Sequence, residues 1–202
     1  MTREELIQQI ESYTPYNEQE EHDKELILSA LKEREEIFTR KDTLAHMTAS
    51  AWIINETHDK VLMCYHNIYR SYSWLGGHAD GEIDLLKVAL KEAKEESSLT
   101  SIAPVTKEIF SLESLTVNGH IKRGEYVSSH LHLNLTYLLQ ADEREVLHIK
   151  EDENSSLKWF TFEEALKAST EEWFVERIYP KLNEKVKRYF ARRQGSLENI
   201  SK

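Results

Sequence analysis

The chain of 202 residues is long enough for one well-filled hydrophobic core and short for two. Apolar residues make up 40% of the sequence and charged residues 31%, a composition typical of a soluble globular protein. The formal net charge of −10 argues against general nucleic-acid binding, which requires a surplus of Lys and Arg. It allows a small phosphorylated ligand whose charge a bound cation balances.

Cysteine content and hydropathy exclude further classes of protein. Cys64 is the single cysteine, so neither a disulfide framework within the chain nor a cysteine-based zinc site is possible. The N-terminus, Met1 to Tyr13, is charged and lacks the apolar core of a signal peptide. No apolar run approaches the ~20 residues that a membrane helix requires. We therefore expect a cytoplasmic protein that binds neither nucleic acid nor membrane.

Helices are predicted over the first part of the chain, from about Thr2 to Thr39. Leu6 and Ile10 recur at helical spacing, and a second apolar stripe of the same kind follows. The run is interrupted at Pro15, because a proline disfavours helix in the residue before it. We interpret residues 1–44 as a helical extension packed on the main domain. A dimerisation arm, which would make the protein a homodimer, is the alternative interpretation.

The remainder of the chain, residues 45–202, is predicted to alternate between strands and helices. Segments rich in β-branched and aromatic residues predict strands, the first two as a hairpin, and apolar stripes at three- and four-residue spacing predict helices. Interleaved elements indicate an α/β or α+β domain in which helices cover a sheet and a helix ends the chain. The predicted strands are 48–54, 61–65, 108–116, 130–139 and 157–162, and the predicted helices are 84–97 (with Asp84 as N-cap), 162–168 and 173–192.

Glu92, Glu95 and Glu96 lie in the helix predicted over residues 84–97. Residues three and four apart share a helix face, so Glu92 is adjacent to both of the others and the three carboxylates repel one another. Magnesium relieves such repulsion, since it takes carboxylate and water oxygens and usually binds substrate phosphates too. A solvated acidic helix face is the alternative interpretation. The glycine-rich segment Gly76 to Gly81, predicted to be a loop, favours the metal site, because glycines let the backbone approach a ligand closely.

This combination of segments resembles the Nudix box, whose pattern is G-x5-E-x7-R-E-U-x-E-E-x-G-U, with U a bulky aliphatic residue. Gly77 matches the first glycine and Leu99 the closing aliphatic residue. Glu92, Glu95 and Glu96 match the three glutamates of the R-E-U-x-E-E core, without a gap in the spacing. The sequence therefore resembles the Nudix family at the positions that carry its metal chemistry.

Three positions depart from the Nudix pattern. Ile83 stands in place of the first glutamate, Lys91 replaces the arginine and Ser98 replaces the second glycine. In the family the first glutamate and the arginine are largely architectural and can pair with each other. Glu82 and Asp84 flank Ile83, so a local bulge would bring either of them into the glutamate's role. The resemblance thus implies a complete metal site on an altered scaffold.

The resemblance covers roughly residues 46 to 168 and implies a Nudix-type α/β/α sandwich with a mixed sheet, to which the N-terminal helices are added. It implies hydrolysis of a diphosphate linkage in a nucleoside diphosphate joined to another group, with Mg²⁺ as cofactor and Mn²⁺ as a substitute. Glu92, Glu95 and Glu96 would hold the metal, and Glu95 is also a candidate catalytic residue. The family often takes another acidic residue from a loop before the last strand. Glu153 is that candidate here, and a solvated acidic loop is the alternative.

The segment from His130 to Thr136 alternates strictly between polar residues and leucine. In a strand this places the leucines on one face, predicted to be core, and the polar residues on the other. We predict that the polar face lines a cleft, with an ordinary solvent-facing strand as the alternative. Asp80 has the alternative role of supporting the turn before Gly81. Contacts to the substrate are therefore predicted for Gly76, Gly77, His78, Asp80, His130, His132 and Asn134.

Two rival functions are compatible with the same fold. The first is an isomerase of diphosphate esters similar to isopentenyl diphosphate isomerase, a chemistry that needs a cysteine and a glutamate facing the substrate. Cys64 lies in the predicted hairpin, where we interpret it as buried filler. The second is a non-catalytic module that senses a nucleotide or another ligand. Loss of the metal glutamates would favour that module, and here they are present.

Overall fold

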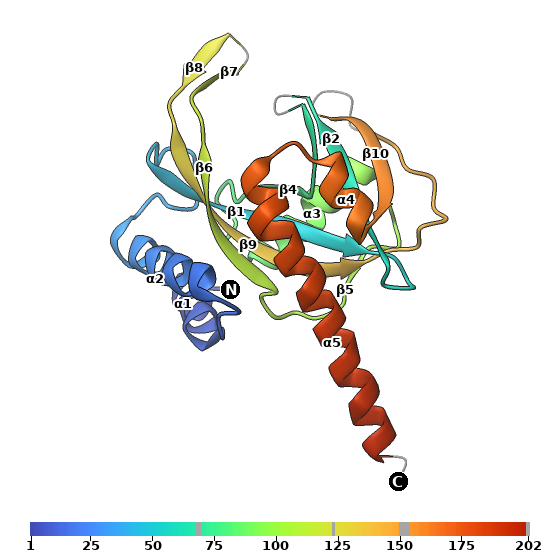
Figure 1. The fold of residues 1–202 in the computed structure, drawn as a ribbon. Coiled ribbons are helices and arrows are strands. Elements are labelled where there is room, and N and C mark those ends of the chain that lie inside the picture. Colours follow the sequence, from blue (N-terminus) through green and yellow to red (C-terminus); the bar gives the residue numbers. More distant parts are fainter. Residues whose placement is uncertain (68–69, 123, 150–153, 201–202) are drawn as a thin grey trace.

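The computed structural model describes residues 1–67, 70–122, 124–149 and 154–200, with the backbone alone for residues 194–200. An eight-stranded sheet forms its centre, and a separate two-stranded hairpin stands beyond one end of it (Figure 1). The strands of the sheet are β1 (Ala45–Ile54), β2 (Lys60–His66), β3 (Ser71–Ser73), β4 (Leu75–His78), β5 (Ala103–Pro104), β6 (Ser111–Val117), β9 (His130–Gln140) and β10 (Asn154–Thr161), and the hairpin is β7 (His120–Lys122) and β8 (Glu125–Val127).

The sheet is mixed, because β1 and β9 run parallel while its other paired strands are antiparallel. Its central path is β10-β2-β1-β9-β5, with β3 paired to β2, β4 to β1 and β6 to β9. β1 is the middle strand of that path and is buried along its whole length. The antiparallel pairing of β1 with β2 confirms the predicted hairpin.

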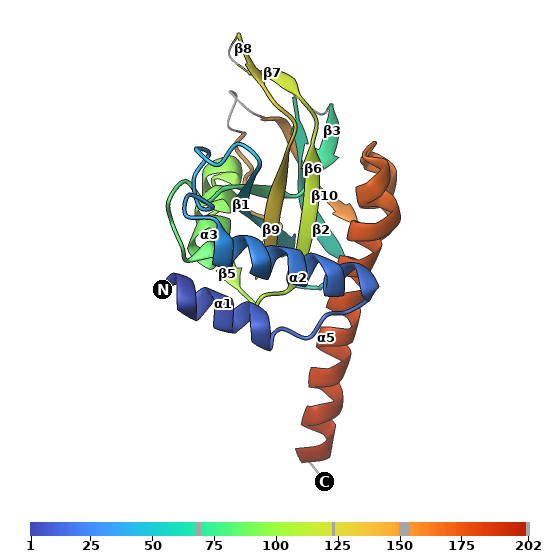
Figure 2. The ribbon, with the colours of Figure 1, turned by 90° about the vertical axis from the view of Figure 1, so that its left-hand side faces the viewer.

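Helices cover both faces of the sheet. They are α1 (Arg3–Ser12), α2 (Glu18–Glu33), α3 (Leu85–Ser97), α4 (Phe162–Ala168), a π-helical turn η1 (Phe174–Ile178) and α5 (Tyr179–Ile200). The sheet lies between α3 on one side and α4 and α5 on the other (Figures 1 and 2). This arrangement confirms the predicted α/β/α sandwich with a mixed sheet. Within the described residues, none of these helices is long and apolar enough to cross a membrane.

One face of β1 and β9 changes character halfway along the strands. On this face β1 carries His46, Thr48 and Ser50 and then the apolar Trp52 and Ile54. On β9 the parallel partners of the polar residues are His132, Asn134 and Thr136, and the partner of Trp52 is the apolar Leu138. The apolar half packs in the same cluster as α4 and α5, whereas the polar half forms the wall of a pocket. The position of the pocket is therefore set by where the strand pattern turns polar.

α1 and α2 pack their apolar stripes into the cluster that also contains α3. Leu6, Ile10, Ile27 and Leu31 are fully buried there. Figure 2 shows the two helices side by side, α2 lying along the sheet. The extension therefore packs on the main domain, as interpreted from the sequence. A domain boundary at residue 44 and a homodimer stay predictions.

The prediction of helix as far as Thr39 is wrong, since α2 ends at Glu33. Arg34 is extended, and its guanidinium donates to both carboxylate oxygens of Asp42 at 2.5 and 2.6 Å. This ion pair fixes the direction in which the chain leaves the helix. The tendency of a charged segment to continue a helix is weak, and tertiary contacts override it.

The segment 34–44 joins the N-terminal helices to the rest of the molecule. Ile37 and Phe38 are buried in the core. Their carbonyl oxygens accept hydrogen bonds from the backbone amides of Met47 and Gly81, at 2.7 and 2.8 Å. The segment is not helical because its two apolar side chains are buried in the core. Its two carbonyl groups accept hydrogen bonds from β1 and from the turn before α3, instead of from amides of a continuing helix.

Two further elements differ from prediction, and one matches it. Gly76 and Gly77, expected in a loop, lie in β4 and pair with β1. The last helix, predicted over 173–192, begins as the π-helical turn η1 and extends as α5 to residue 200. α3 matches the prediction, with the carboxylate of Asp84 accepting a hydrogen bond from Lys87 N at 3.4 Å.

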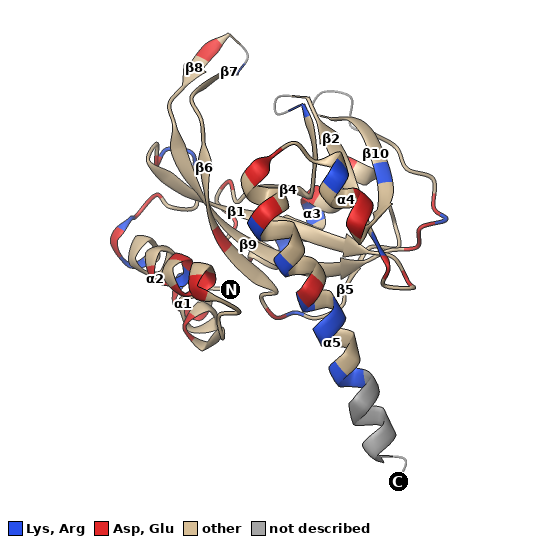
Figure 3. Ribbon diagram, in the orientation of Figure 1, with Lys and Arg blue, Asp and Glu red and all other residues tan. Residues whose placement is uncertain are grey.

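A buried ion network ties α2 and α5 to β6. Lys181 Nζ lies 3.1 Å from Glu20 Oε1 and 3.0 Å from Glu113 Oε1, and Lys185 Nζ lies 2.9 Å from Glu20 Oε1. The two glutamates are fully buried and Lys181 is 2% exposed. Burial alone would raise the pKa of Glu20, but the two ammonium groups outweigh it and lower the pKa to about 2. Elsewhere acidic residues predominate on α1 and α2, and basic residues gather along the lower described part of α5 (Figure 3).

Candidate active site

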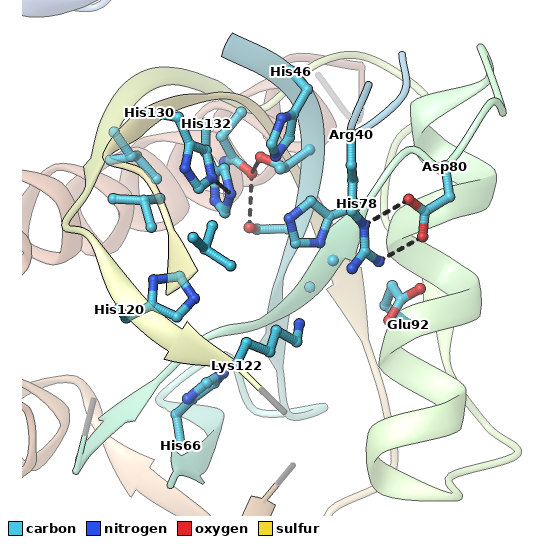
Figure 4. Close-up of a pocket in the computed structure, with 18 of the residues that line it drawn as sticks. Arg40, His46, His66, His78, Asp80, Glu92, His120, Lys122, His130 and His132 are labelled. Atoms are coloured by element: carbon cyan, nitrogen blue, oxygen red, sulfur yellow. Dashed lines mark hydrogen bonds and ion pairs between the residues drawn. The ribbon is translucent and has the colours of Figure 1, made fainter. Parts of the chain in front are cut away.

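A cavity of about 640 Å³ lies at the polar half of the strand face, between the β7–β8 hairpin and α3. β1, β4 and β9 supply its sheet wall, and α3 supplies carboxylates from the opposite side. Figure 4 shows histidines gathered at one end and Glu92 at the other. The charged or ionisable residues lining the cavity include Arg40, His46, His66, His78, Asp80, Lys91, Glu92, Glu95, Glu96, His120, Lys122, His130 and His132.

The three predicted metal ligands reach this cavity from α3, but their environments differ. Glu96 is 5% exposed, and its two carboxylate oxygens accept hydrogen bonds from Gly76 N and Asn154 Nδ2, both at 3.0 Å. The side chain of Glu92 is 14% exposed, and that of Glu95 is 44% exposed. A carboxylate has about four lone-pair positions, so Glu96 keeps acceptor capacity for a cation.

Gly76 and Gly77 are required for the approach of these carboxylates to β4. A Cβ atom at Gly77 would lie 2.6 Å from Glu92 Cδ, closer than van der Waals contact allows. A Cβ atom at Gly76 would lie 2.5 Å from the carbonyl oxygen of Ala49 in β1. The glycines thus permit close approach within a strand, and Gly81, with φ +95°, supplies the turn that leads into α3.

The replacement of the family's arginine by Lys91 changes the pairing on α3. Lys91 Nζ lies 3.2 Å from Glu92 Oε1 and 3.6 Å from Glu95 Oε1, and the hydrogen bond that the lysine donates to Glu92 raises the pKa of Lys91. The carboxylate of Glu82 instead accepts hydrogen bonds from the backbone amides of Ile83 and of the residue after it. In this structure Glu82 thus supports the turn before α3, and Asp84 caps the helix. A role for either residue in place of the family's glutamate stays a prediction.

Four histidine rings meet at the other end of the cavity. The ring centroid of His46 lies 5.0 Å from that of His78, 4.8 Å from that of His130 and 5.0 Å from that of His132. Burial lowers the pKa of His78 to about 3 and the pKa of His132 to about 2, and it also lowers the pKa of His46. These three rings are therefore uncharged at neutral pH.

Asp80 is engaged by a residue from the N-terminal part of the chain. Arg40 donates to both of its carboxylate oxygens, at 2.8 and 2.7 Å, and this bidentate pair lowers the pKa of Asp80. Asp80 also has a positive φ of 45°, in the turn before Gly81. Figure 4 shows the pair beside His78 and near Glu92, at the edge of the same cavity.

Asn134 lies at the floor of the cavity and is fully buried. Its carbonyl oxygen accepts hydrogen bonds from Thr48 and Ser50 at 3.0 and 2.9 Å, and its amide nitrogen donates to Glu113 and Thr136, both at 3.1 Å. All four hydrogen bonds of the amide are thus made inside the protein. Asn134 joins the cavity floor to the buried ion network.

Among the predicted substrate-binding residues, the structure places Gly76, Gly77, His78, Asp80, His130, His132 and Asn134 around one cavity with the three glutamates. Their roles stay predictions. Glu153 falls outside the described residues. Leu131 and Leu133 belong to the core on the other face, as the alternation predicts.

Sequence reasoning missed three residues of the site: Arg40, His46 and Asn154. The sequence contains a pattern that could have predicted the position of His46. Residues 45–51 alternate between apolar and polar types as β9 does, which places His46 on the polar face of a strand. Asn154 stands at the start of β10 next to Glu96, and nothing in its surroundings in the sequence marks it. Arg40 follows the segment predicted to be helical, and nothing in its surroundings in the sequence predicts its contact with the turn before α3.

Comparisons with known proteins agree with this arrangement. The family model of the NUDIX domain matches residues 44–182, more than half of the chain. Similar solved structures include an Ap4A hydrolase of C. elegans in a binary complex (TM-score 0.51, 18% identity, covering 72% of this chain and 97% of that one). Another is the MutT protein from Methanosarcina mazei Go1 (TM-score 0.50, 15% identity, covering 73% and 96%). A sequence comparison with curated proteins gave no match.

The family match defines the class of this protein. The fold and the family match identify a pyrophosphohydrolase of the Nudix type, an enzyme that acts on acid anhydrides. The chain belongs to the NUDIX family.

Proposed function

We propose that the protein is a Mg²⁺-dependent hydrolase that cleaves the diphosphate linkage of a nucleoside diphosphate joined to another group. The observation that carries this proposal is the contact of two α3 glutamates with the paired glycines of β4. Glu96 accepts a hydrogen bond from Gly76 N, and Glu92 packs against Gly77. The Nudix carboxylates are thereby held at a cavity large enough for a nucleotide.

The donor set at this end of the cavity fits magnesium. Glu92, Glu95 and Glu96 offer hard carboxylate oxygens, which Mg²⁺ prefers, and Mn²⁺ accepts the same ligands. Lys91 Nζ sits between two of these carboxylates and balances their charge in the absence of a cation. When bound, a divalent ion of this kind neutralises the diphosphate and lowers the pKa of water.

The protein's own residues would perform the remaining tasks. Arg40, Lys91 and Lys122 line the cavity and bring positive charge to the phosphates in a protein whose net charge is −10. Glu95 is the more exposed of the carboxylates, and we assign it the removal of a proton from the attacking water. The hydrogen bonds from Gly76 and Asn154 orient Glu96 before any ligand arrives.

The isomerase alternative loses support from the position of its required cysteine. Cys64 is 1% exposed, its Sγ lies 3.7 Å from the carbonyl oxygen of Trp74, and burial raises its pKa. It is packed in the core cluster that holds α3. We expect Cys64→Ala to retain turnover, and loss of turnover in a folded Cys64→Ala protein would favour the isomerase.

The test of the proposal is a screen of nucleoside diphosphate derivatives and dinucleoside polyphosphates, Ap4A included, with Mg²⁺ or Mn²⁺ and measurement of the released nucleotide. With any substrate found, Glu96→Gln should lower turnover by roughly 10²–10³-fold, the usual effect of removing one preorganised electrostatic group. Glu163→Gln, at an exposed glutamate of α4, is the matched control and should keep full turnover.

Glu96→Gln also places an amide where two donors converge, so a modest loss of stability is expected. Thermal unfolding therefore accompanies the assay, which is run below the melting temperature of the variant. Equal turnover in the folded wild type and variant would contradict the proposal. Absence of hydrolysis across the screen with both metals would do the same.

A further inference from the structure

Three histidines at the end of the cavity remote from the α3 carboxylates form a compact group. His46 lies beside His132 in the parallel register of β1 and β9, and His130 is two residues along the same face. One ligand nitrogen from each of the three rings lies within 4.8 Å of the other two. In the part of the chain that the structure describes, this is the one such group of three His, Cys, Asp or Glu side chains.

Backbone carbonyl groups fix the orientation of two of these rings. His46 Nδ1 lies 3.1 Å from the carbonyl oxygen of Asp42, and His130 Nδ1 lies 2.8 Å from that of Ser128. Because a carbonyl oxygen only accepts hydrogen bonds, the proton of each neutral ring is on Nδ1 and the lone pair is on Nε2. Histidines that bind metals are held in this way, with the other ring nitrogen donating to a carbonyl or carboxylate group.

The Nε2 atom of His46 is buried and lacks a hydrogen-bond partner. The residue is 5% exposed, so water does not compensate the lone pair from bulk solvent. Buried polar atoms are nearly always paired, and an orphan of this kind requires an explanation such as an ion. His46 is also one of the three histidines whose ligand nitrogens gather here.

The spacing of the nitrogens suits one shared ion. His130 Nε2 and His132 Nε2 are 3.2 Å apart. Two nitrogens that each lie about 2.0–2.1 Å from a tetrahedral zinc ion are about 3.3–3.4 Å apart. The pair therefore needs almost no movement. Because His130 Nε2 carries a lone pair, His132 donates this hydrogen bond through Nε2. Binding of an ion at His132 Nε2 would require that proton to move to Nδ1 of the same ring, which keeps His132 neutral.

We propose that His46, His130 and His132 form a second metal site, for a borderline first-row transition ion such as Zn²⁺, distinct from the carboxylate site of α3. Imidazole nitrogens suit zinc and its neighbours, whereas magnesium prefers oxygen ligands. Three neutral ligands leave the charge of the ion uncompensated and one coordination position open. An anionic group of a ligand in the cavity, such as a phosphate or carboxylate, is the complement of that position.

This proposal does not depend on the hydrolase function, since metal binding is measured without a substrate. Untagged full-length protein, freed of metal with a chelator, is titrated with Co²⁺ as a spectroscopic substitute for Zn²⁺. We expect one equivalent of Co²⁺ with the visible absorption of a nitrogen-bound ion of low coordination number. Zn²⁺ should displace it, and a large excess of Mg²⁺ should not.

His130→Gln and His132→Gln separate this site from the rest of the cavity. Each should weaken Co²⁺ binding by roughly 10²-fold or more, because loss of even an outer-shell partner commonly weakens metal binding by about 10–100-fold. His120→Gln, which alters another histidine of the same cavity, should bind as the wild type does. Glu92→Gln should also retain the Co²⁺ spectrum.

A melting experiment guards against variants that fold poorly. Zn²⁺ at about 100 times its Kd should raise the Tm of the wild type by about 5–10 °C and leave that of His132→Gln unchanged. The proposal is overturned if Co²⁺ gives only the weak spectrum of octahedral oxygen ligands. It is also overturned if the histidine variants bind as tightly as the wild type, or if Glu92→Gln alone abolishes binding.

Discussion

The buried ion network and the polar lining of the cavity adjoin each other at β9. They differ in how many of their charged and polar groups have a hydrogen-bond or ion-pair partner. In the network of Glu20, Glu113, Lys181 and Lys185, each buried charge has an opposite charge within about 3 Å. In the cavity, by contrast, the carboxylates of α3 lie near one another and the Nε2 of His46 has no partner. Complete pairing suits a role in stability, while incomplete pairing leaves positions for ligands.

Asn134 stands between the two clusters and belongs to both. Its amide donates to Glu113 of the network, and its carbonyl oxygen accepts from Thr48 and Ser50 in the cavity wall. Changes on the two sides of this residue should therefore have opposite signatures. Network variants should lose folding free energy with turnover per folded molecule intact. Cavity variants such as Glu92→Gln, whose side chain has no buried partner to lose, should lose turnover with little change in folding free energy.

The largest expected effect on stability is that of Glu20→Gln. It leaves Lys181 and Lys185 buried with one counter-charge fewer, and breaking a buried pair costs about 3–5 kcal/mol. Urea unfolding measures the loss, and Glu18→Gln, at an exposed glutamate of the same helix, should change the unfolding free energy by under about 0.5 kcal/mol. A loss below about 1 kcal/mol for Glu20→Gln would show that the network contributes little.

Glu92→Gln should have the complementary signature. Loss of one metal-binding carboxylate should reduce turnover by roughly 10²–10³-fold, equivalent to about 2.7–4 kcal/mol. The unfolding free energy should stay within about 0.5–1 kcal/mol of the wild-type value, because the main partner of Glu92 is the largely exposed Lys91. A fall in stability as large as that of Glu20→Gln would remove the distinction between the clusters.

The pH dependence of stability sharpens the comparison. The pKa of Glu20 is lowered from 4.5 to about 2 in the folded protein, so its contribution is fully present above about pH 4.5 and is lost as the pH falls towards 2. The wild type should lose about 3 kcal/mol over this window through this group. Unfolding of Glu20→Gln should show a correspondingly weaker dependence between pH 4.5 and 2, and identical slopes would contradict the pairing.

Gly77→Ala should imitate part of the Glu92 effect without removing a charge. The added methyl group would lie 2.6 Å from Glu92 Cδ and must displace that carboxylate, so we expect turnover to fall by about 10-fold. Gly81→Ala is the matched control, since its Cβ meets no atom within 4 Å and only its φ of +95° is strained. It should cost about 1 kcal/mol of stability and spare turnover.

Arg40→Ala should have the smallest effect on stability. Arg40 and Asp80 are 50% and 54% exposed, and exposed ion pairs are worth about 0–1 kcal/mol. Because Arg40 lines the cavity, the KM for a phosphorylated substrate should rise while kcat changes less. An unchanged KM would place Arg40 outside the binding surface.

The parts of the fold predicted from the sequence are those whose periodicity is local. α3 was predicted from its apolar stripe, and β9 was predicted from its strict alternation of polar and apolar residues. Each of these patterns determines which face of the element is buried. β4 was not foreseen as a strand, since glycines weaken a strand pattern, and here their lack of side chains serves contacts with β1 and Glu92. Long-range contacts of this kind have no local signature.

The same limit applies to the candidate site. The three glutamates and His132 were found because spacing on one helix or strand was enough. His46 required the alternation of a second strand, and the pair between Arg40 and Asp80 joins residues 40 positions apart. No spacing rule links these two residues, because the loop that carries Arg40 is positioned by buried neighbours rather than by its own pattern.

The segment 34–44 bears on how the protein can be divided. It lies before the start of the NUDIX match at residue 44, yet Phe38 accepts a hydrogen bond from Gly81 and Arg40 holds Asp80. A protein trimmed to the family's boundaries would lose Arg40 and Thr43 from the lining of its cavity. When Nudix domains are exchanged between proteins, the segment 34–44 should therefore be transferred together with the domain. Arg40 lies outside the matched range, so a substitution there would alter the cavity while leaving every residue of the matched domain unchanged.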